Sequence, residues 1–76
     1  MNAYKAVATR IVNAEEKFIE YAMNTASLTR TEAISALMAY QKYKVIKIDA
    51  IGGQFTFKHG IYGDKDVLQK AAQEQI

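Results

Sequence analysis

The strongest constraint on the fold of this chain is the placement of its helix-breaking residues. Proline is absent, and none of the four glycines precedes the Gly52–Gly53 pair. Because glycine and proline are the strongest local interrupters of regular structure, the chain before Gly52 can form long helices, whereas the chain after it must turn repeatedly. The sequence therefore predicts an α+β domain with a helical front and strands behind it.

The first helix is expected over residues 3–23, where apolar residues recur at helical spacing. This stripe consists of Tyr4, Val7, Ala8, Ile11, Ala14, Phe18 and Ala22. One long helix explains the unbroken stripe most simply. However, Asn13 and Glu16 have the spacing of a capping box, which would divide the segment into two shorter helices.

A second helix is expected over residues 29–43, after a turn at residues 24–28. Thr29 and Glu32 have the spacing of a capping box, a reliable sign of a helix start. Its apolar face is predicted to carry Ala33, Ile34, Leu37, Met38 and Tyr40. The opposite, exposed face is predicted to carry Thr31, Glu32, Ser35, Ala36, Ala39 and Lys42.

Residues 44–60 alternate polar and apolar side chains on both sides of Gly52–Gly53, which is the pattern of a β-hairpin. If the two glycines form a two-residue turn, Ile48 lies opposite Phe57. The large apolar side chains of both strands then share one face, because side chains alternate along a strand. We expect the helices to cover this face and to form the core with it.

A third helix is expected after Gly63, with Asp64 as its N-cap. Its modest apolar face is formed by Val67, Leu68, Ala71 and Ala72. The predicted order is α-α-β-β-α, with one hairpin. We expect a single domain over residues 1–76, since so short a chain builds only one core.

Several classes of protein and site are disfavoured by composition. The chain has no cysteine and one histidine, and neither serine lies in a nucleophile elbow, so we expect no enzyme, no metal site and no cofactor. No apolar run approaches the ~18 residues of a membrane span, and the first ten residues lack the apolar centre of a signal peptide. We expect a soluble, cytoplasmic protein with no membrane partner.

Positive charge concentrates at the end of the second helix and in the hairpin. Lys42, Lys44, Lys47 and Lys58 stand there against Asp49 alone, a local charge of +3 in a chain whose total is +2. The two-residue turn would put Lys47 directly opposite Lys58, and like charges so placed destabilise a strand pair by up to ~1 kcal/mol. An anionic partner would relieve this repulsion. Alternatively, the lysines only keep the strand edges from pairing with other chains.

The stretch LTRTEAISALMAYQKYKVIKIDAIGGQFTFKHG resembles the last helix and the wing of a winged-helix DNA-binding domain. A capped helix ends near a tyrosine–lysine pair, and a hairpin follows at once. The resemblance covers about half the chain and implies that the 29–43 helix enters the major groove of double-stranded DNA while the hairpin contacts the backbone. The DNA-contacting residues that it implies are Arg30, Thr31, Ser35, Lys42, Lys44, Lys47 and Lys58. A winged helix has two helices before this one, whereas the unbroken stripe predicts one.

Two functions therefore remain open. The first is a small, non-enzymatic DNA-binding regulator. The second is a protein-interaction module, either an accessory or stoichiometric inhibitor or a homodimer, because Ser35, Ala36 and Ala39 on the exposed face of the 29–43 helix would let another helix approach closely. The ending KHGIYGDKDVL is similar to small phage- or prophage-type proteins of unassigned role.

Overall fold

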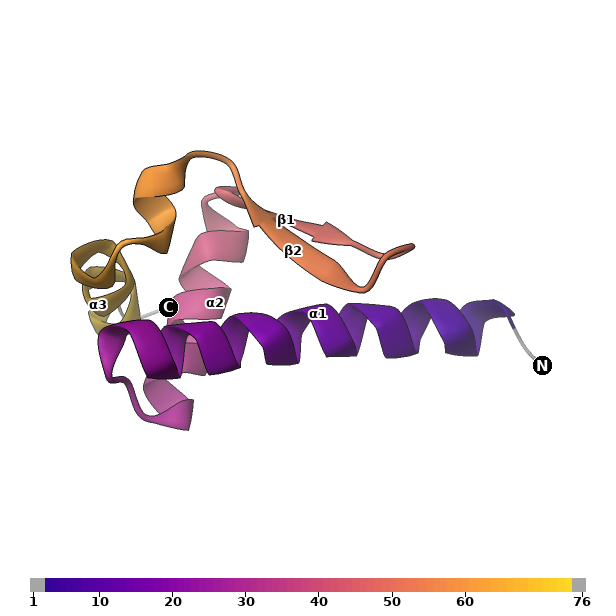
Figure 1. Ribbon diagram of the computed structural model, residues 1–76, viewed down its shortest axis with the longest axis horizontal. Coiled ribbons are helices and arrows are strands. Elements are labelled where there is room, and N and C mark those ends of the chain that lie inside the picture. The colour runs from indigo at the N-terminus through magenta and orange to yellow at the C-terminus, as the bar shows by residue number, and fades with distance from the viewer. Residues whose placement is uncertain (1–2, 75–76) are drawn as a thin grey trace.

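The computed structural model describes residues 3–74, and their side chains from residue 8 onward. Its elements are α1 (Ala3–Ala26), α2 (Arg30–Lys42), β1 (Ile46–Asp49), β2 (Gln54–Phe57), the short 3₁₀ helix η1 (Gly60–Gly63) and α3 (Lys65–Gln73). The predicted α+β class and α-α-β-β-α order are confirmed. Helix α1 runs along the whole length of the molecule, with α2 crossing behind it, the hairpin over its N-terminal half and α3 at the opposite end (Figure 1).

Helix α1 is a single helix, so the capping-box spacing of Asn13 and Glu16 does not divide it. Ala14, Phe18 and Ala22 are fully buried and continue one face across this point, as the stripe predicts. A break at this point would interrupt the continuous buried face, and the stability that this face contributes outweighs the capping box that Asn13 and Glu16 could form. Of the other stripe members, Ala8 is exposed and Ile11 is half-buried, and the side chains of Tyr4 and Val7 lie outside the described residues.

The capping box at the start of α2 is confirmed. The Glu32 N–H donates to Thr29 Oγ1 at 3.2 Å, and the Thr29 N–H donates to Glu32 Oε1 at 2.9 Å. These bonds satisfy two of the backbone donors that a helix start leaves open. The bond from the Thr29 backbone also lowers the pKa of Glu32, since it favours the charged carboxylate.

The predicted faces of α2 are partly wrong. Ile34 and Met38 are 37% and 48% exposed, whereas Ala36 and Ala39 are 0% and 1% exposed. Helix α2 packs against both α1 and α3, and its small alanine side chains lie buried within the chain. Ser35 is half-buried beside them. The small-residue face expected to receive a partner helix is thus used within the chain, since small side chains let α3 approach closely.

The hairpin register also differs from the prediction. Ile46 pairs with Phe57 and Ile48 with Phe55, so the strands slip by two residues relative to a Gly52–Gly53 turn. A slip of two leaves every side chain on its predicted face, because the side-chain period of a strand is two. The apolar residues of both strands therefore still face the core, although their partners change.

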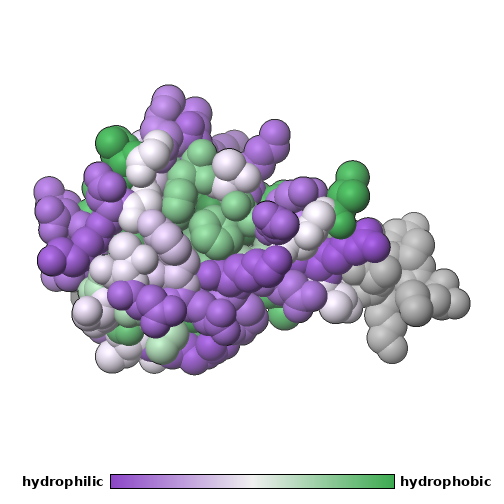
Figure 2. All heavy atoms as spheres, in the orientation of Figure 1, coloured by the Kyte–Doolittle hydropathy of each residue, from purple (hydrophilic) through white to green (hydrophobic). Residues whose placement is uncertain are grey.

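The cause of the slip is Asp49. Its carboxylate accepts the Ile51 N–H at 2.9 Å, and its carbonyl accepts the Gly53 N–H at 2.9 Å, so the chain leaves the ladder at this residue. Gly53 then adopts a φ of +67° and is buried against the backbone of Arg10 in α1. Ile51 is 83% exposed, and hydrophobic atoms appear at this end of the hairpin in Figure 2, where others lie at the centre and the upper left of the same face among polar atoms.

Aromatic rings fill the space between α1 and the hairpin. The Phe18 ring lies edge-on to the rings of Tyr40 and Phe55, with centroid distances of 5.5 Å in both cases. Edge-to-face pairs of this kind add to the stability gained from burial alone. Two tyrosines extend this packing to η1: the Tyr21 hydroxyl donates to the Gly63 carbonyl and the Tyr40 hydroxyl to the Tyr62 carbonyl, each at 2.6 Å.

Helix α3 closes the core from the far side of α2. Leu68 is fully buried and Ala71 nearly so, as its predicted apolar face requires. Asp64 occupies the predicted N-cap position, but its side chain makes no capping hydrogen bond. None of the helices in residues 3–74 combines the length and the hydrophobicity that crossing a membrane requires.

Candidate nucleic-acid interface

Three of the predicted DNA-contacting lysines meet around one hollow on the hairpin. The hollow has a volume of about 330 Å³. It is lined by Lys44, Ile46, Lys47, Thr56, Phe57 and Lys58, and we call it the lysine hollow. No carboxylate lies among these lining residues, which are three lysines and one threonine beside the apolar side chains of Ile46 and Phe57. Such a set of donors suits the oxygens of a phosphate group.

The position of Lys44 follows from the way α2 ends. Lys44 has a φ of 57°, and its N–H donates to the Gln41 carbonyl at 3.2 Å. The Val45 N–H donates to the Tyr40 carbonyl at 3.0 Å, which completes a Schellman motif. This motif turns the chain sharply into β1, so that Lys44 lies at the base of the hairpin beside the two strands.

The positions of Lys47 and Lys58 follow from the register. Lys47 pairs with Thr56. The Lys58 N–H donates to the Val45 carbonyl at 2.8 Å, which continues the ladder by one residue beyond the Ile46–Phe57 pair. The predicted direct opposition of Lys47 and Lys58 is therefore wrong. The two lysines are diagonal neighbours, for which the usual spacing is about 7–8 Å.

The diagonal arrangement reduces the repulsion between Lys47 and Lys58 that the sequence predicted. Lysines at diagonal positions repel each other less than lysines directly opposite, so the ladder does not need an anion to relieve them. However, Lys47 and Lys58 still share one face of the hairpin, with Thr56 directly opposite Lys47, so both lysines are placed to contact a phosphate backbone. Thr56 is the lining residue that the sequence did not indicate, because its position depends on the register.

The predicted contacts on α2 are only partly available. Arg30 forms a bidentate ion pair with Glu16, with Nη1–Oε2 and Nη2–Oε1 distances of 3.1 and 2.5 Å. The hydrogen bonds from Arg30 lower the pKa of Glu16, so this pair is charged at neutral pH. Arg30 thus joins α1 to α2 through an exposed ion pair, and its predicted contact with DNA stays a prediction.

The remaining predicted residues of α2 differ in exposure. Thr31 and Lys42 are exposed, whereas Ser35 is half-buried. The Lys42 ammonium lies 5.4 Å from the centroid of the Tyr43 ring, a cation–π contact at the end of the helix. The exposed face of α2 therefore offers Thr31 and Lys42, together with the exposed apolar side chains of Ile34 and Met38.

Comparison with known protein families, with curated proteins and with solved structures finds no match for this chain. The resemblance of the middle of the chain to a winged helix therefore remains a similarity of pattern. Within residues 3–74, no three or more His, Asp or Glu side chains are grouped so that they could hold a metal ion.

Proposed function

We propose that the protein is a small DNA-binding domain of the regulatory kind, which grips the phosphate backbone of a duplex with its lysine hollow. The observation that carries the proposal is the convergence of Lys44, Lys47, Lys58 and Thr56 on one hollow that no carboxylate lines. Lysine is a point charge with three donors, so it serves backbone contact and not the reading of base edges.

The neighbouring helix supports the same proposal. A connection of three residues, Ser27–Thr29, joins α1 to α2, which is the turn length typical of helix-turn-helix pairs. Thr31 and Lys42 are exposed on α2, and Lys42 lies two residues before Lys44 of the lysine hollow. In this arrangement α2 approaches the groove and the hairpin contacts the flanking phosphates. Arg30 and Ser35 have no part in it.

The test is a charge-matched comparison of two double variants. Lys47→Gln with Lys58→Gln removes two ammonium groups from the lysine hollow, whereas Lys17→Gln with Lys65→Gln removes two exposed lysines from α1 and α3. Fluorescence anisotropy with a labelled mixed-sequence duplex measures both. We expect the first variant to bind at least about tenfold more weakly than the second at low salt. Equal affinities would show that only net charge matters and would refute the proposed interface.

A homodimer is a second candidate function, and it now rests on different residues from those expected. Ile34 and Met38 are exposed one turn apart on α2, where paired apolar side chains are suited to a self-complementary helix contact. Sedimentation velocity across a concentration series tests this. A dimer that Met38→Glu dissociates supports it, and a monomer at millimolar concentration contradicts it.

A further inference from the structure

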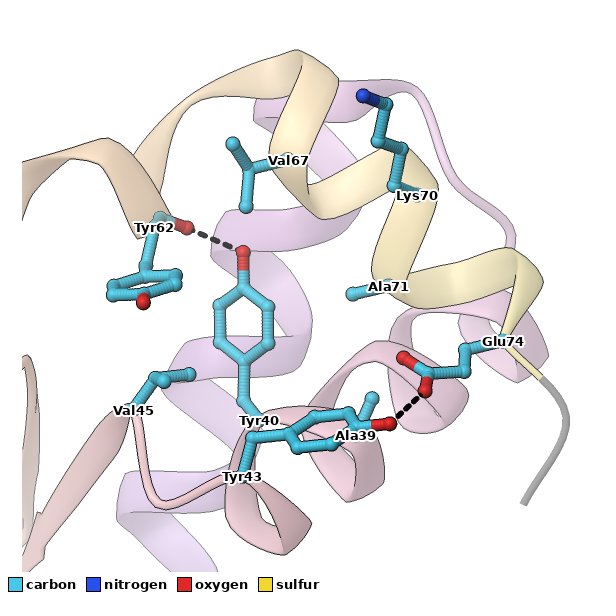
Figure 3. A pocket seen from close by; sticks show the side chains of 9 residues that line it. All are labelled: Ala39, Tyr40, Tyr43, Val45, Tyr62, Val67, Lys70, Ala71 and Glu74. Carbon is cyan, nitrogen blue, oxygen red and sulfur yellow. Dashed lines mark hydrogen bonds between the residues drawn. The ribbon is translucent and has the colours of Figure 1, made fainter.

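A second hollow lies between α2, η1 and α3, on a part of the molecule that the proposed DNA contacts do not use. Its volume is about 410 Å³, which is within the range of small-molecule sites. We call it the tyrosine hollow. Its lining residues include Tyr40, Tyr43, Tyr62, Lys70 and Glu74 (Figure 3).

Three tyrosines border this hollow, of which Tyr43 is exposed, Tyr62 is half-buried and Tyr40 is buried. The rings of Tyr40 and Tyr62 meet nearly at right angles, with a centroid distance of 5.8 Å and an interplanar angle of 75°. The Tyr40 hydroxyl donates to the Tyr62 backbone carbonyl at 2.6 Å, which holds the Tyr40 ring in place. Tyr43 crosses below Tyr40, and its hydroxyl donates to the Glu74 carboxylate (Figure 3). The aromatic walls are therefore held in place before any ligand enters.

The electrostatic character of the tyrosine hollow favours a cation. Aromatic rings present a negative face, and Glu74 adds a carboxylate at the rim. The last turns of both α2 and α3 border the hollow, and the C-terminal end of a helix carries the negative pole of its dipole. The ammonium of Lys70, the one lining cation, points away from Tyr40 in Figure 3.

The Lys42 ammonium lies 5.4 Å from the centroid of the Tyr43 ring, so this ring already makes one cation–π contact, and Lys42 adds a positive charge beside the hollow. A compact ammonium ion that carries methyl groups combines the two properties that the hollow selects. Its methyl groups suit the walls formed by Val45, Val67 and Ala71, and its charge suits the rings and Glu74. We propose that the tyrosine hollow binds a methylated ammonium ion of the choline type.

The test compares choline with 3,3-dimethylbutan-1-ol, in which a carbon atom replaces the charged nitrogen and the shape is unchanged. Each is titrated into the full chain labelled with ¹⁵N, and amide shifts are followed by NMR. We expect saturable shifts centred on Tyr43, Tyr62 and Val67 with choline, and at least about tenfold weaker binding of the neutral alcohol. Equal binding of the two would show a merely apolar hollow and would overturn the proposal. The absence of saturable shifts with choline would also overturn it.

Two variants with opposite expected effects separate the role of the rim charges from a loss of fold. Glu74→Gln is expected to weaken choline binding by about fivefold to tenfold, and Lys70→Gln to strengthen it by about twofold. Glu20→Gln, an exposed change of the same charge on α1, serves as the matched control and should leave binding unchanged. The proposal fails if Glu74→Gln and Glu20→Gln have the same effect on a folded chain, as judged from the NMR spectrum.

Discussion

The Tyr40 hydroxyl donates a hydrogen bond to the Tyr62 carbonyl at 2.6 Å and thereby ties the end of α2 to η1. We expect Tyr40→Phe to lower the free energy of unfolding by about 1 kcal/mol, because the Tyr62 carbonyl loses its donor in a partly buried position. Urea unfolding followed by circular dichroism measures the change. Tyr62→Phe removes a hydroxyl without removing this bond and should cost less than about 0.5 kcal/mol. Equal costs would contradict the importance of the bond.

The burial of Tyr40 also leads to a prediction of how the stability of the fold changes at alkaline pH. Burial, as the main cause, raises the pKa of Tyr40 above its ordinary value near 10. A raised pKa means that the folded chain holds this proton more tightly than the unfolded chain does. Its contribution is therefore fully present below about pH 10 and is lost as the pH rises through the higher folded pKa. Urea midpoints between pH 8 and 11 should fall more steeply for the natural chain than for Tyr40→Phe. Parallel curves would contradict this.

Two glycines in η1 offer a matched test of packing. A Cβ atom at Gly63 would lie 2.9 Å from Tyr21 Oη and 3.1 Å from an edge carbon of Phe57, whereas a Cβ at Gly60 would meet nothing within 4 Å. Gly63→Ala must therefore displace the Tyr21–Gly63 hydrogen bond, and we expect a loss of about 1–3 kcal/mol. Gly60→Ala should change stability by less than about 0.5 kcal/mol. Thermal unfolding of the two variants measures the difference, and a reversed order would contradict the packing described.

The left-handed backbone conformation of Lys44, at the end of α2, leads us to predict a stabilising substitution. Lys44 has a φ of 57°, a conformation that costs a residue with a Cβ roughly 1 kcal/mol relative to glycine. We expect Lys44→Gly to raise the free energy of unfolding by about 0.5–1 kcal/mol. Lys42→Gly, within the last helical turn, should instead lower it by about 1 kcal/mol. Chemical denaturation of both variants provides the comparison, and destabilisation by Lys44→Gly would contradict the Schellman geometry.

The periodic features of the sequence predicted the fold well. The stripe through Ala14, Phe18 and Ala22, the Thr29 capping box and the alternation in the hairpin are local patterns, and each corresponds to an observed element. The sequence also predicted correctly which side of each strand faces the core, because a slip of two residues leaves the side chains on the same faces.

The incorrect predictions depend on contacts between distant parts of the chain or on side-chain turn chemistry. The buried face of α2 was misjudged because α2 packs against both α1 and α3, and no pattern within residues 30–42 reveals the second contact. The register was misjudged because the Asp49 carboxylate starts the turn before the glycines. The ion pair between Arg30 and Glu16 likewise joins residues from two helices, so the sequence alone could not reveal it.

The ion pair between Arg30 and Glu16 gives a prediction that distinguishes binding at the lysine hollow from binding at the interface implied by the winged-helix resemblance. Arg30→Gln should change duplex affinity by less than about twofold, since its guanidinium already binds Glu16 and lies outside the lysine hollow. Anisotropy titration measures this beside Lys58→Gln, which removes the same charge from the hollow. A larger loss with Arg30→Gln than with Lys58→Gln would favour the implied interface over the lysine hollow.

The most direct measurement of the central claim is the salt dependence of duplex binding by the natural chain. Neutralisation of three phosphates by Lys44, Lys47 and Lys58 gives a slope of about −2.7 for log K against log salt concentration. The Lys47→Gln, Lys58→Gln variant should reduce the magnitude of this slope to about 1, whereas the Lys17→Gln, Lys65→Gln variant should preserve it. A slope near zero for the natural chain, or the same slope for all three proteins, would contradict phosphate binding in the lysine hollow.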